Sequence, residues 1–370
     1  MLFALLGDAT GSSRALRQLR AMRAAGLRVV LLGFGPMRDP GALPEGVAAR
    51  RLPLPRGRGP AFFLAADRAV RRVARALPAR LCFASDLYVL PALAAAARRY
   101  EARLVYDARE LYAALDATAG RPLVGQAWDA LEHAYARRAD AVLTVCDSIA
   151  DRLAARHGIA RPHVFHNAPD HAAVPPRTDA LRARLGLDDR PVVLYQGLFR
   201  EGRGLPALLR AAAAVPDVQL VLVGEGALEA DLRAVATPLG GRVRFVPFTP
   251  PDALAVLTAS ADVGVVLIEG LTESLRLSLP NKLFEYLAAG VPVLASPLPE
   301  ISRVVETFGV GLTADPGDPD ALARALARLA TDAALRARLA AAAPAAAAAY
   351  SWAHAAPRFQ RLLASLLDPA

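Results

Sequence analysis

The residues of this chain that stand out chemically are Asn281, Lys282 and Glu285, in the stretch "SLPNKLFEYLAAGVPVLAS". Lys282 is the only lysine among 44 basic residues, and Asn281 is one of two asparagines. Because Pro280 suits the start of a helix, Asn281 and Lys282 are expected in its first turn. The helix dipole disfavours a cation there unless an anion binds at the same end. The stretch therefore predicts an anion site, with Glu285 one turn later accepting hydrogen bonds from hydroxyl groups.

The bland alternative is an exposed Lys–Glu pair on a helix surface, which contributes only tenths of a kcal/mol. It leaves unexplained why an arginine-rich chain uses lysine at this one position.

A second candidate region is "YQGLFREGRGLPALLRA", where an apolar run ends at Gly197 and two further glycines precede a helical pattern. Glycine lets the backbone approach a ligand, and helix N–H groups attract an anion. Arg200 and Arg203 add forked donors that suit phosphate. A plain turn with solvent-facing arginines explains the loop equally well. The next apolar run ends in "VGEG", which contains Gly224, and this signal is weak by itself.

The elements that must position these residues are solid apolar runs separated by helical patterns. Such runs predict parallel strands buried on both faces, and hence doubly wound α/β domains. The alternation stops in a stretch rich in proline and aspartate and then restarts. We therefore expect a first domain at 1–168, a linker at 169–190, a second domain at 191–345, and a C-terminal helix at 346–370 that crosses back to the first domain. Two such domains facing a central cleft would bring the carboxyl ends of their sheets to one site, with a hinge in the linker.

The positive charge is concentrated in the first 100 residues, which carry 17 arginines and five acidic residues, a net +12 in a chain of net +9. Nucleic acid, an anionic membrane surface and a phosphorylated substrate are the candidate partners. In 61–77, apolar residues (Phe62, Phe63 and Leu64) precede arginines (Arg68, Arg71, Arg72 and Arg75). This pattern is typical of an interfacial helix, and equally of a surface helix that packs its aromatic rings on its own sheet. Nucleic acid is disfavoured because no stacking aromatic residues accompany the arginines.

Cys82 and Cys146 lie in apolar runs, which predicts buried thiols in a reducing compartment. The sequence has no Cys/His spacing typical of a metal site, so we expect no metal. It also has no apolar run long enough to span a bilayer. We expect a cytoplasmic protein, with peripheral contact to the inner face of the membrane as the extension suggested by the basic helix.

Taken in order along nearly the whole chain, these segments resemble a GT-B glycosyltransferase of the retaining family 4 type. "YQGLFREGRG" resembles the phosphate loop of that family, and "LVGEG" resembles its second strand turn. "PNKLFEYLAAGVPVLAS" resembles the segment that carries the second glutamate of its E-x7-E motif. "VYDARELY" resembles its Asp-x-His-Glu segment, and "YSWAHAAPRFQRLL" resembles its last helix.

The resemblance implies a nucleoside diphosphate sugar as co-substrate, with no further cofactor. Its implied donor-side residues are Gly197, Arg200, Arg203, Gly224, Phe248, Pro280, Asn281, Lys282 and Glu285. Arg203 and Lys282 would stabilise the leaving diphosphate, Glu285 would hold the ribose, and Phe248 would lie near the base. Glu110 is expected with Arg203 and Lys282 among the catalytic residues, and Gly11, Ser12, Asp107 and Arg109 on the acceptor side.

Two positions depart from the family pattern. The first glutamate of E-x7-E falls at Leu277, for which Glu269, Glu273 or Ser278 could substitute, and the expected histidine is Arg109. Arginine stays charged and cannot act as a base. Three functions remain open: a glycosyltransferase of polysaccharide or glycoconjugate biosynthesis, a catalytically silent sugar-nucleotide binder or partner subunit, and a sugar-nucleotide 2-epimerase. The acceptor is expected to be anionic or lipid-linked.

Overall fold

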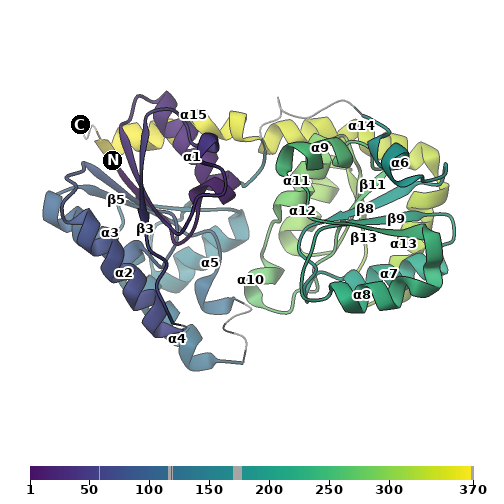
Figure 1. Cartoon of the computed structure of the whole chain (residues 1–370), viewed down its shortest axis with the longest axis horizontal. Coiled ribbons are helices and arrows are strands. Elements are labelled where there is room, and N and C mark those ends of the chain that lie inside the picture. Colours follow the sequence, from purple (N-terminus) through teal and green to yellow (C-terminus); the bar gives the residue numbers. More distant parts are fainter. Residues whose placement is uncertain (58, 116–117, 119, 170–176, 368–370) are drawn as a thin grey trace. The chain divides into compact units, whose positions relative to one another are not determined.

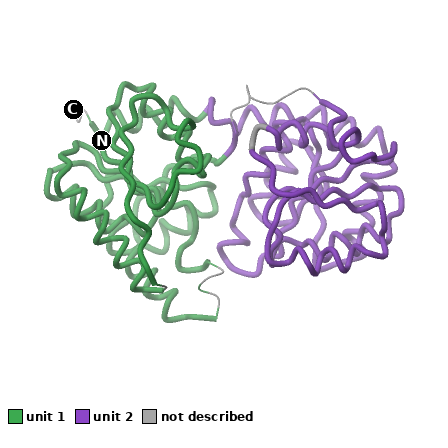
Figure 2. Tube along the Cα trace, viewed as in Figure 1, with its two compact units in different colours: residues 1–167, 355–370 green, residues 168–354 purple. Residues whose placement is uncertain are grey.

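A computed structural model of the chain describes residues 1–57, 59–115, 118, 120–169 and 177–367. The chain divides into two compact units, one of residues 1–167 with 355–370 and one of residues 168–354 (Figure 2). No helix in the described ranges is long and apolar enough to cross a membrane.

Unit 1 contains, in its described part, a parallel sheet of seven strands in the order β3-β2-β1-β4-β5-β6-β7 (Figure 1). The strands are β1 (Leu2–Ala4), β2 (Val29–Phe34), β3 (Val47–Leu52), β4 (Leu81–Ala84), β5 (Arg103–Asp107), β6 (Ala141–Thr144) and β7 (His163–Val164). The helices are α1 (Ser13–Ala24), α2 (Pro60–Ala74), α3 (Leu90–Tyr100), α4 (Pro122–Ala136) and α5 (Asp147–His157), with short 3-10 turns η1 (Ala9–Gly11), η2 (Pro40–Ala42) and η3 (Tyr112–Ala114). The predicted parallel, doubly wound architecture is confirmed.

Strand β3 was not predicted. Its sequence "VAARRL" is exposed at all but its two ends, so it lacks the apolar run that marks a buried strand. Because β3 lies at the edge of the sheet beside β2, it needs no apolar residues on both faces.

Unit 2 contains, over its described residues, a parallel sheet of six strands in the order β10-β9-β8-β11-β12-β13. The strands are β8 (Val192–Gln196), β9 (Gln219–Val223), β10 (Val243–Val246), β11 (Val263–Val266), β12 (Val293–Ala295) and β13 (Gly311–Thr313). The helices are α6 (Ala180–Leu185), α7 (Leu205–Ala214), α8 (Glu229–Ala236), α9 (Pro251–Thr258), α10 (Glu273–Arg276), α11 (Asn281–Ala288), α12 (Pro299–Phe308), α13 (Pro319–Thr331) and α14 (Ala333–Tyr350), with a 3-10 segment η6 (Thr237–Arg242). The strand order reverses between β8 and β11, which is where open α/β sheets bind ligands.

The two faces of the unit 2 sheet are covered by different helices (Figure 1). Val193 and Tyr195 of β8 share one apolar core with α7, α8 and α13. Gln196 points to the opposite face, where it contacts Thr258 of α9 and Glu285 of α11. This alternation along β8 decides which side chains reach the site described below.

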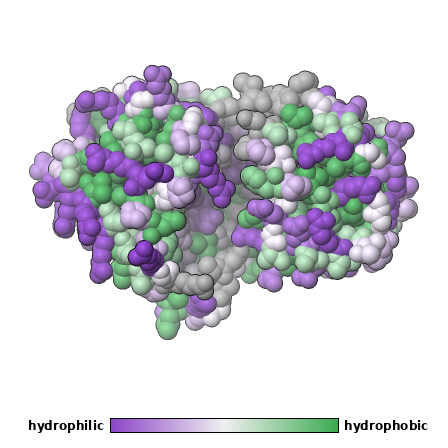
Figure 3. All heavy atoms as spheres, viewed as in Figure 1, coloured by the Kyte–Doolittle hydropathy of each residue, from purple (hydrophilic) through white to green (hydrophobic). Residues whose placement is uncertain are grey.

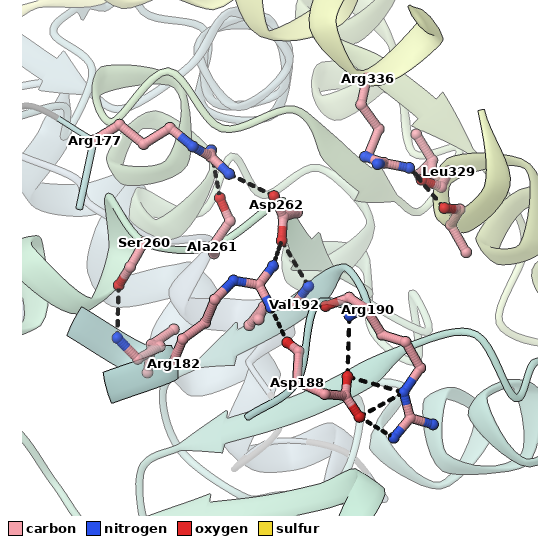
Figure 4. A network of polar contacts seen from close by, with 12 residues as sticks. Arg177, Arg182, Asp188, Arg190, Val192, Ser260, Ala261, Asp262, Leu329 and Arg336 are labelled. Carbon is pink, nitrogen blue, oxygen red and sulfur yellow. Dashed lines mark hydrogen bonds and ion pairs between the residues drawn. The ribbon is translucent and has the colours of Figure 1, made fainter. Parts of the chain in front are cut away.

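The segment expected to be a linker, residues 169–190, contains a helix and belongs to unit 2. Residues 170–176 lie outside the described ranges, and the rest, from Arg177 to Arg190, includes helix α6 and is fastened to unit 2 (Figure 4). The Asp262 carboxylate, just before β11, forms ion pairs with Arg177 and Arg182 and accepts a hydrogen bond of 2.8 Å from Val192 N. The residues from Arg177 onward are therefore part of unit 2, and the hinge expected in the linker stays a prediction.

The C-terminal region also differs from the expected single helix at 346–370. Helix α14 ends at Tyr350, and α15 (Trp352–Leu367) begins after Ser351, whose hydroxyl accepts a hydrogen bond from His354 N. Residues 355–370 belong to unit 1, where Phe359 packs against Phe83 and Phe165.

Candidate functional site

The carboxyl ends of β8 and β9 are joined by backbone contacts that only glycine permits. Gly197 N donates to Val223 O at 2.9 Å, and Phe199 N donates to Glu225 O at 2.8 Å. Gly224 has a φ of 149°, and a Cβ added there would lie 1.9 Å from Gly197 O. The glycine of "VGEG" is therefore required for the approach of two loops to each other, and its predicted contact with a ligand stays a prediction.

Helix α11 begins as predicted. Pro280 is its N-cap residue with extended backbone angles, and no side chain caps the first turn. Asn281, the exposed first residue, and Lys282 follow in that first turn. The free N–H groups of this turn carry the positive end of the helix dipole.

Lys282 lies at the edge of the sheet over the ring of Tyr195, with Nζ 3.8 Å from the ring centroid. Within the described ranges, its Nζ donates no hydrogen bond and forms no ion pair. A Cβ on Gly197 would lie 3.1 Å from this Nζ, so the missing side chain leaves room for the lysine. Burial lowers the pKa of Lys282 to about 7, with further lowering by Arg203 and Arg200 and partial compensation by Glu285. A bound anion would relieve this repulsion between cations.

Arg203 is partly buried between two glycines whose positive φ angles fix the loop, Gly202 at 76° and Gly204 at 61°. A Cβ at Gly204 would lie 2.6 Å from the Cβ of Leu267, so only glycine fits where this end of the loop packs against Leu267. Arg200 is exposed, and both arginines act on the pKa of Lys282 and of Tyr195. The structure thus places Arg200, Arg203 and Lys282 within electrostatic reach of one another.

Glu285 is oriented by two residues that were not predicted, Gln196 and Thr258. Gln196, which is buried at the end of β8, donates from Nε2 to Glu285 Oε2 at 2.5 Å. Thr258, also buried, contacts Gln196 Oε1 at 2.8 Å. The sequence feature that could have indicated this role is the glutamine at the end of an otherwise apolar strand, "VVLYQ", because a buried amide needs hydrogen-bond partners.

The other donor-side prediction, Phe248, and the possible substitutes for the first glutamate also belong to unit 2. Phe248 follows β10 and is 59% exposed. Leu277 is the C-cap residue of α10, Glu273 is the first residue of that helix, and the Ser278 hydroxyl donates to Leu275 O at 2.7 Å. Glu269 is exposed. Leu277 itself offers no polar atom to a sugar.

In unit 1, the predicted acceptor-side residues separate into two groups. Asp107 is fully buried, and its carboxylate is bound by Arg14 at 2.6 and 2.8 Å and by Gln18 at 2.8 Å. A carboxylate with this environment holds α1 against the sheet, and its place on the acceptor side stays a prediction. Ser12 caps α1 through its hydroxyl, and Gly11 before it is exposed.

Arg109 and Glu110 follow β5 and retain exposed surface. The Arg109 Nη2 atom lies 3.7 Å from Asp86 Oδ2, while Asp86 accepts backbone hydrogen bonds from Leu6 at 2.6 Å and from Val89 at 3.1 Å. Burial raises the pKa of Asp86, and Arg109 opposes that rise. The Asp86 carboxylate thus holds the Arg109 guanidinium and also accepts hydrogen bonds from two backbone N–H groups.

No group of three or more His, Cys, Asp or Glu side chains in the described ranges is placed to hold a metal ion.

Two known protein families match this chain. The profile described as "Glycosyl transferase 4-like domain" matches residues 10–168, and the one described as "Glycosyl transferases group 1" matches residues 190–332. The chain belongs to the group 1 glycosyltransferase family. The first match ends at the boundary between the units, and the second includes every residue of the cluster around Lys282.

Curated relatives match parts of this group 1 chain. The lipopolysaccharide core biosynthesis glycosyltransferase LpsE of Rhizobium meliloti is 35% identical over 154 residues, which are 41% of this chain and 43% of that protein. The phosphatidyl-myo-inositol mannosyltransferase of Mycobacterium leprae is 37% identical over 186 residues, 46% of this chain and 45% of that protein. The chain thus spans about half the length of the curated relatives it matches.

Solved structures match the whole fold. Sucrose-phosphate synthase from Thermosynechococcus elongatus superposes with a TM-score of 0.79 at 22% identity, covering 99% of both chains. Anabaena Alr3699/HepE in complex with UDP-glucose gives a TM-score of 0.77 at 19% identity, covering 99% of this chain and 100% of that one. The group 1 chain therefore has the GT-B fold, with two Rossmann-like domains.

Proposed function

We propose that this chain transfers a sugar from a nucleoside diphosphate sugar to an acceptor hydroxyl, with retention at the anomeric carbon. The observation that carries the proposal is a pair of residues on α11. Lys282 makes no ion pair within the described ranges, and Glu285, three residues after it, accepts a hydrogen bond from Gln196. A cation for phosphate and a carboxylate for hydroxyls on one helix suit a nucleoside diphosphate. UDP and UDP-glucose in solved structures with the same fold support this ligand class.

In the proposed reaction, the bond between the anomeric carbon and the diphosphate oxygen breaks, and a bond to the acceptor oxygen forms on the same face of the sugar. The acceptor hydroxyl proton passes to the leaving phosphate oxygen, so the products are a glycoside and a nucleoside diphosphate. Negative charge develops on the diphosphate, where Lys282, Arg203 and the N–H groups at the start of α11 would stabilise it. These cations take the role that a metal ion has in other enzymes, and Glu285 would hold the ribose. Glu110 and Arg109 would act on the acceptor side.

The first experiment is calorimetric titration of the purified chain with UDP, GDP and ADP, followed by a transfer assay with the corresponding labelled sugar nucleotides. Lys282→Ala and Arg203→Ala should each lower kcat/KM by roughly 30- to 1000-fold, if each contact strengthens in the transition state by ~2–4 kcal/mol. Arg210→Ala removes an exposed arginine from α7 of the same unit and serves as the control. Product anomers distinguished by NMR coupling constants test retention. Unchanged kinetics in Lys282→Ala would reject the donor site.

A catalytically silent sugar-nucleotide binder is the second candidate, favoured by Leu277 and Arg109 at positions where the family pattern has glutamate and histidine. It predicts binding of a nucleoside diphosphate sugar without transfer or hydrolysis, whereas the transferase predicts release of nucleoside diphosphate.

For the acceptor, we propose an anionic or lipid-linked molecule met by unit 1 at the inner face of the cytoplasmic membrane. Two cavities of about 480 and 300 Å³ among α2, α3 and α4 are both lined by Arg71 and Arg98. The larger is also lined by Arg138, Glu101 and Asp140, and the smaller by Arg75 and Arg99. Hydrophilic side chains gather over α2 and α3 in Figure 3. Arginines clustered in this way attract anionic surfaces.

Fewer apolar side chains are available to contact a membrane than the sequence of residues 61–77 suggested. Phe63 of α2 stacks on Tyr88 at 4.6 Å and packs edge-on against Trp128 at 4.8 Å, so this ring is used inside unit 1. Leu64 of α2 and Leu123 of α4 are 57% and 78% exposed. Sedimentation with vesicles tests the proposal: binding should require anionic lipid, weaken with salt and disappear when Arg71, Arg72 and Arg75 are changed to Glu. A protein that remains in the supernatant at low salt would exclude the membrane.

A further inference from the structure

The buried side chain of Gln196 is the feature of unit 2 that neither the family pattern nor the sequence argument assigned a role. It closes β8, and its amide has two partners from two different helices: Thr258 of α9 at 2.8 Å and Glu285 of α11 at 2.5 Å. Gln196 is 3% exposed and Thr258 is 2% exposed. Burying an amide is costly unless its groups are hydrogen-bonded, so this arrangement is specific rather than incidental.

The backbone of Gln196 is fixed as firmly as its side chain. Its N–H donates to the Tyr286 hydroxyl at 3.1 Å, and that hydroxyl donates to Leu194 O at 2.9 Å. The Tyr286 ring occupies the space above Gly264, where a Cβ would lie 2.3 Å from the ring. Tyr286 follows Glu285 directly, so the same strand end holds two consecutive residues of α11.

We propose that Gln196 is a positioning residue that sets the Glu285 carboxylate for recognition of the donor ribose, an inference that rests on the proposed nucleoside diphosphate site. The amide occupies Oε2 of Glu285 and fixes the plane of the carboxylate. Oε1 then accepts the ribose hydroxyl in a defined direction. A free glutamate would lose rotamer entropy on binding the ribose, and the amide reduces that cost before the ligand arrives.

Ribose discrimination should then depend on Gln196 and Thr258, although we expect neither side chain to touch the nucleotide. Wild-type protein should bind a ribonucleoside diphosphate more tightly than its 2′,3′-dideoxy counterpart by roughly 10-fold or more, as expected for hydrogen bonds to a charged acceptor. Gln196→Leu should bring this ratio close to 1 while leaving the affinity for the dideoxy compound unchanged within about twofold. Thr258→Val should reduce the ratio in the same direction, because Gln196 loses the contact that holds its amide.

Gln196→Glu gives a pH readout that a merely structural role would not produce. It puts a second carboxylate beside Glu285, and like charges at this distance raise the pKa of one of the pair. The preference of this variant for ribose should therefore strengthen as the pH falls and the pair takes up a proton. Wild type should not show this strengthening.

The experiment is calorimetric titration of the full chain and its variants with UDP, GDP and ADP and with their 2′,3′-dideoxy forms, and unfolding temperatures are measured in parallel. Gln219→Leu is the matched control, because Gln219 is also 3% exposed but starts the neighbouring strand β9 at its amino end.

A ratio of ribose to dideoxyribose affinity that collapses in Gln196→Leu and Thr258→Val but not in Gln219→Leu supports the inference. Equal losses for both ligands, or an unchanged ratio, overturn it. If Gln196→Leu fails to fold, the Thr258→Val and Gln196→Glu results decide the question. A wild-type protein that binds no nucleoside diphosphate overturns the proposed function and this inference with it, whereas binding with a ratio insensitive to Gln196 overturns the inference alone.

Discussion

Replacing Lys282 by methionine should stabilise the protein while abolishing donor binding. The pKa of Lys282 is lowered from 10.5 to about 7, chiefly by burial. The folded state therefore holds this proton less tightly than the unfolded state does. Between pH 7 and 10.5 the unfolded chain carries more protons, so the free energy of unfolding rises with pH across that window. At pH 6 the buried ammonium destabilises the fold most, and Lys282→Met removes that cost.

The magnitude follows from the size of the pKa change. The fall from 10.5 to about 7 corresponds to about 5 kcal/mol at roughly 1.4 kcal/mol per pH unit. Lys282 retains part of its exposure, so solvent screening reduces the effect, and we take about 2 kcal/mol. For a domain of this size, that difference raises Tm by about 4–8 °C.

The assay is calorimetric unfolding of wild type, Lys282→Met and Lys282→Arg at pH 6, 8 and 10, with titration of the nucleoside diphosphate at each pH. Lys282→Met should be more stable than wild type at pH 6 and about equal at pH 10. The affinity of wild type should fall as the pH rises through about 7, because only the ammonium form binds the diphosphate. Lys282→Arg should bind with little dependence on pH, since arginine stays charged.

A lower Tm for Lys282→Met at pH 6 would refute the electrostatic reasoning. Wild-type affinity that stays constant from pH 6 to 9 would refute the role of the ammonium group in binding.

Three further outcomes are expected. Gly264→Ala should destabilise unit 2 by about 1–3 kcal/mol or more in urea, because its Cβ would meet the Tyr286 ring at 2.3 Å; an unchanged midpoint would contradict this packing. Asp107→Asn should cost about 3–5 kcal/mol, because it leaves the Arg14 guanidinium buried without its carboxylate, and a loss within experimental error would show that the ion pair is dispensable. Asp262→Ala should release the segment from Arg177 onward, observed as faster proteolysis between residues 177 and 190, and a cleavage rate equal to wild type would argue against the anchoring role.

The parallel architecture of both units could be predicted from the amino-acid sequence. Strands such as "VVLYQ" and "QLVLV" are buried on both faces, so they read as apolar runs whatever their neighbours are. The start of α11 and the unusual lysine in its first turn could also be predicted, because Pro280 and the rarity of lysine are local features. Strand β3 escaped prediction because an edge strand with exposed arginines leaves no apolar run.

Which side chains contact one another could not be predicted before the fold was known. Asp107 receives two hydrogen bonds from Arg14, which lies 93 residues away in the sequence, and no local pattern predicts that pair. Gln196 and Glu285 come from separate elements, and nothing local links a strand-ending glutamine to a helix 89 residues later. The lowered pKa of Lys282 likewise depends on burial and on two arginines from another loop. Pairing across elements is fixed by sheet order and by the side of the strand that each residue occupies, and these are properties of the assembled fold.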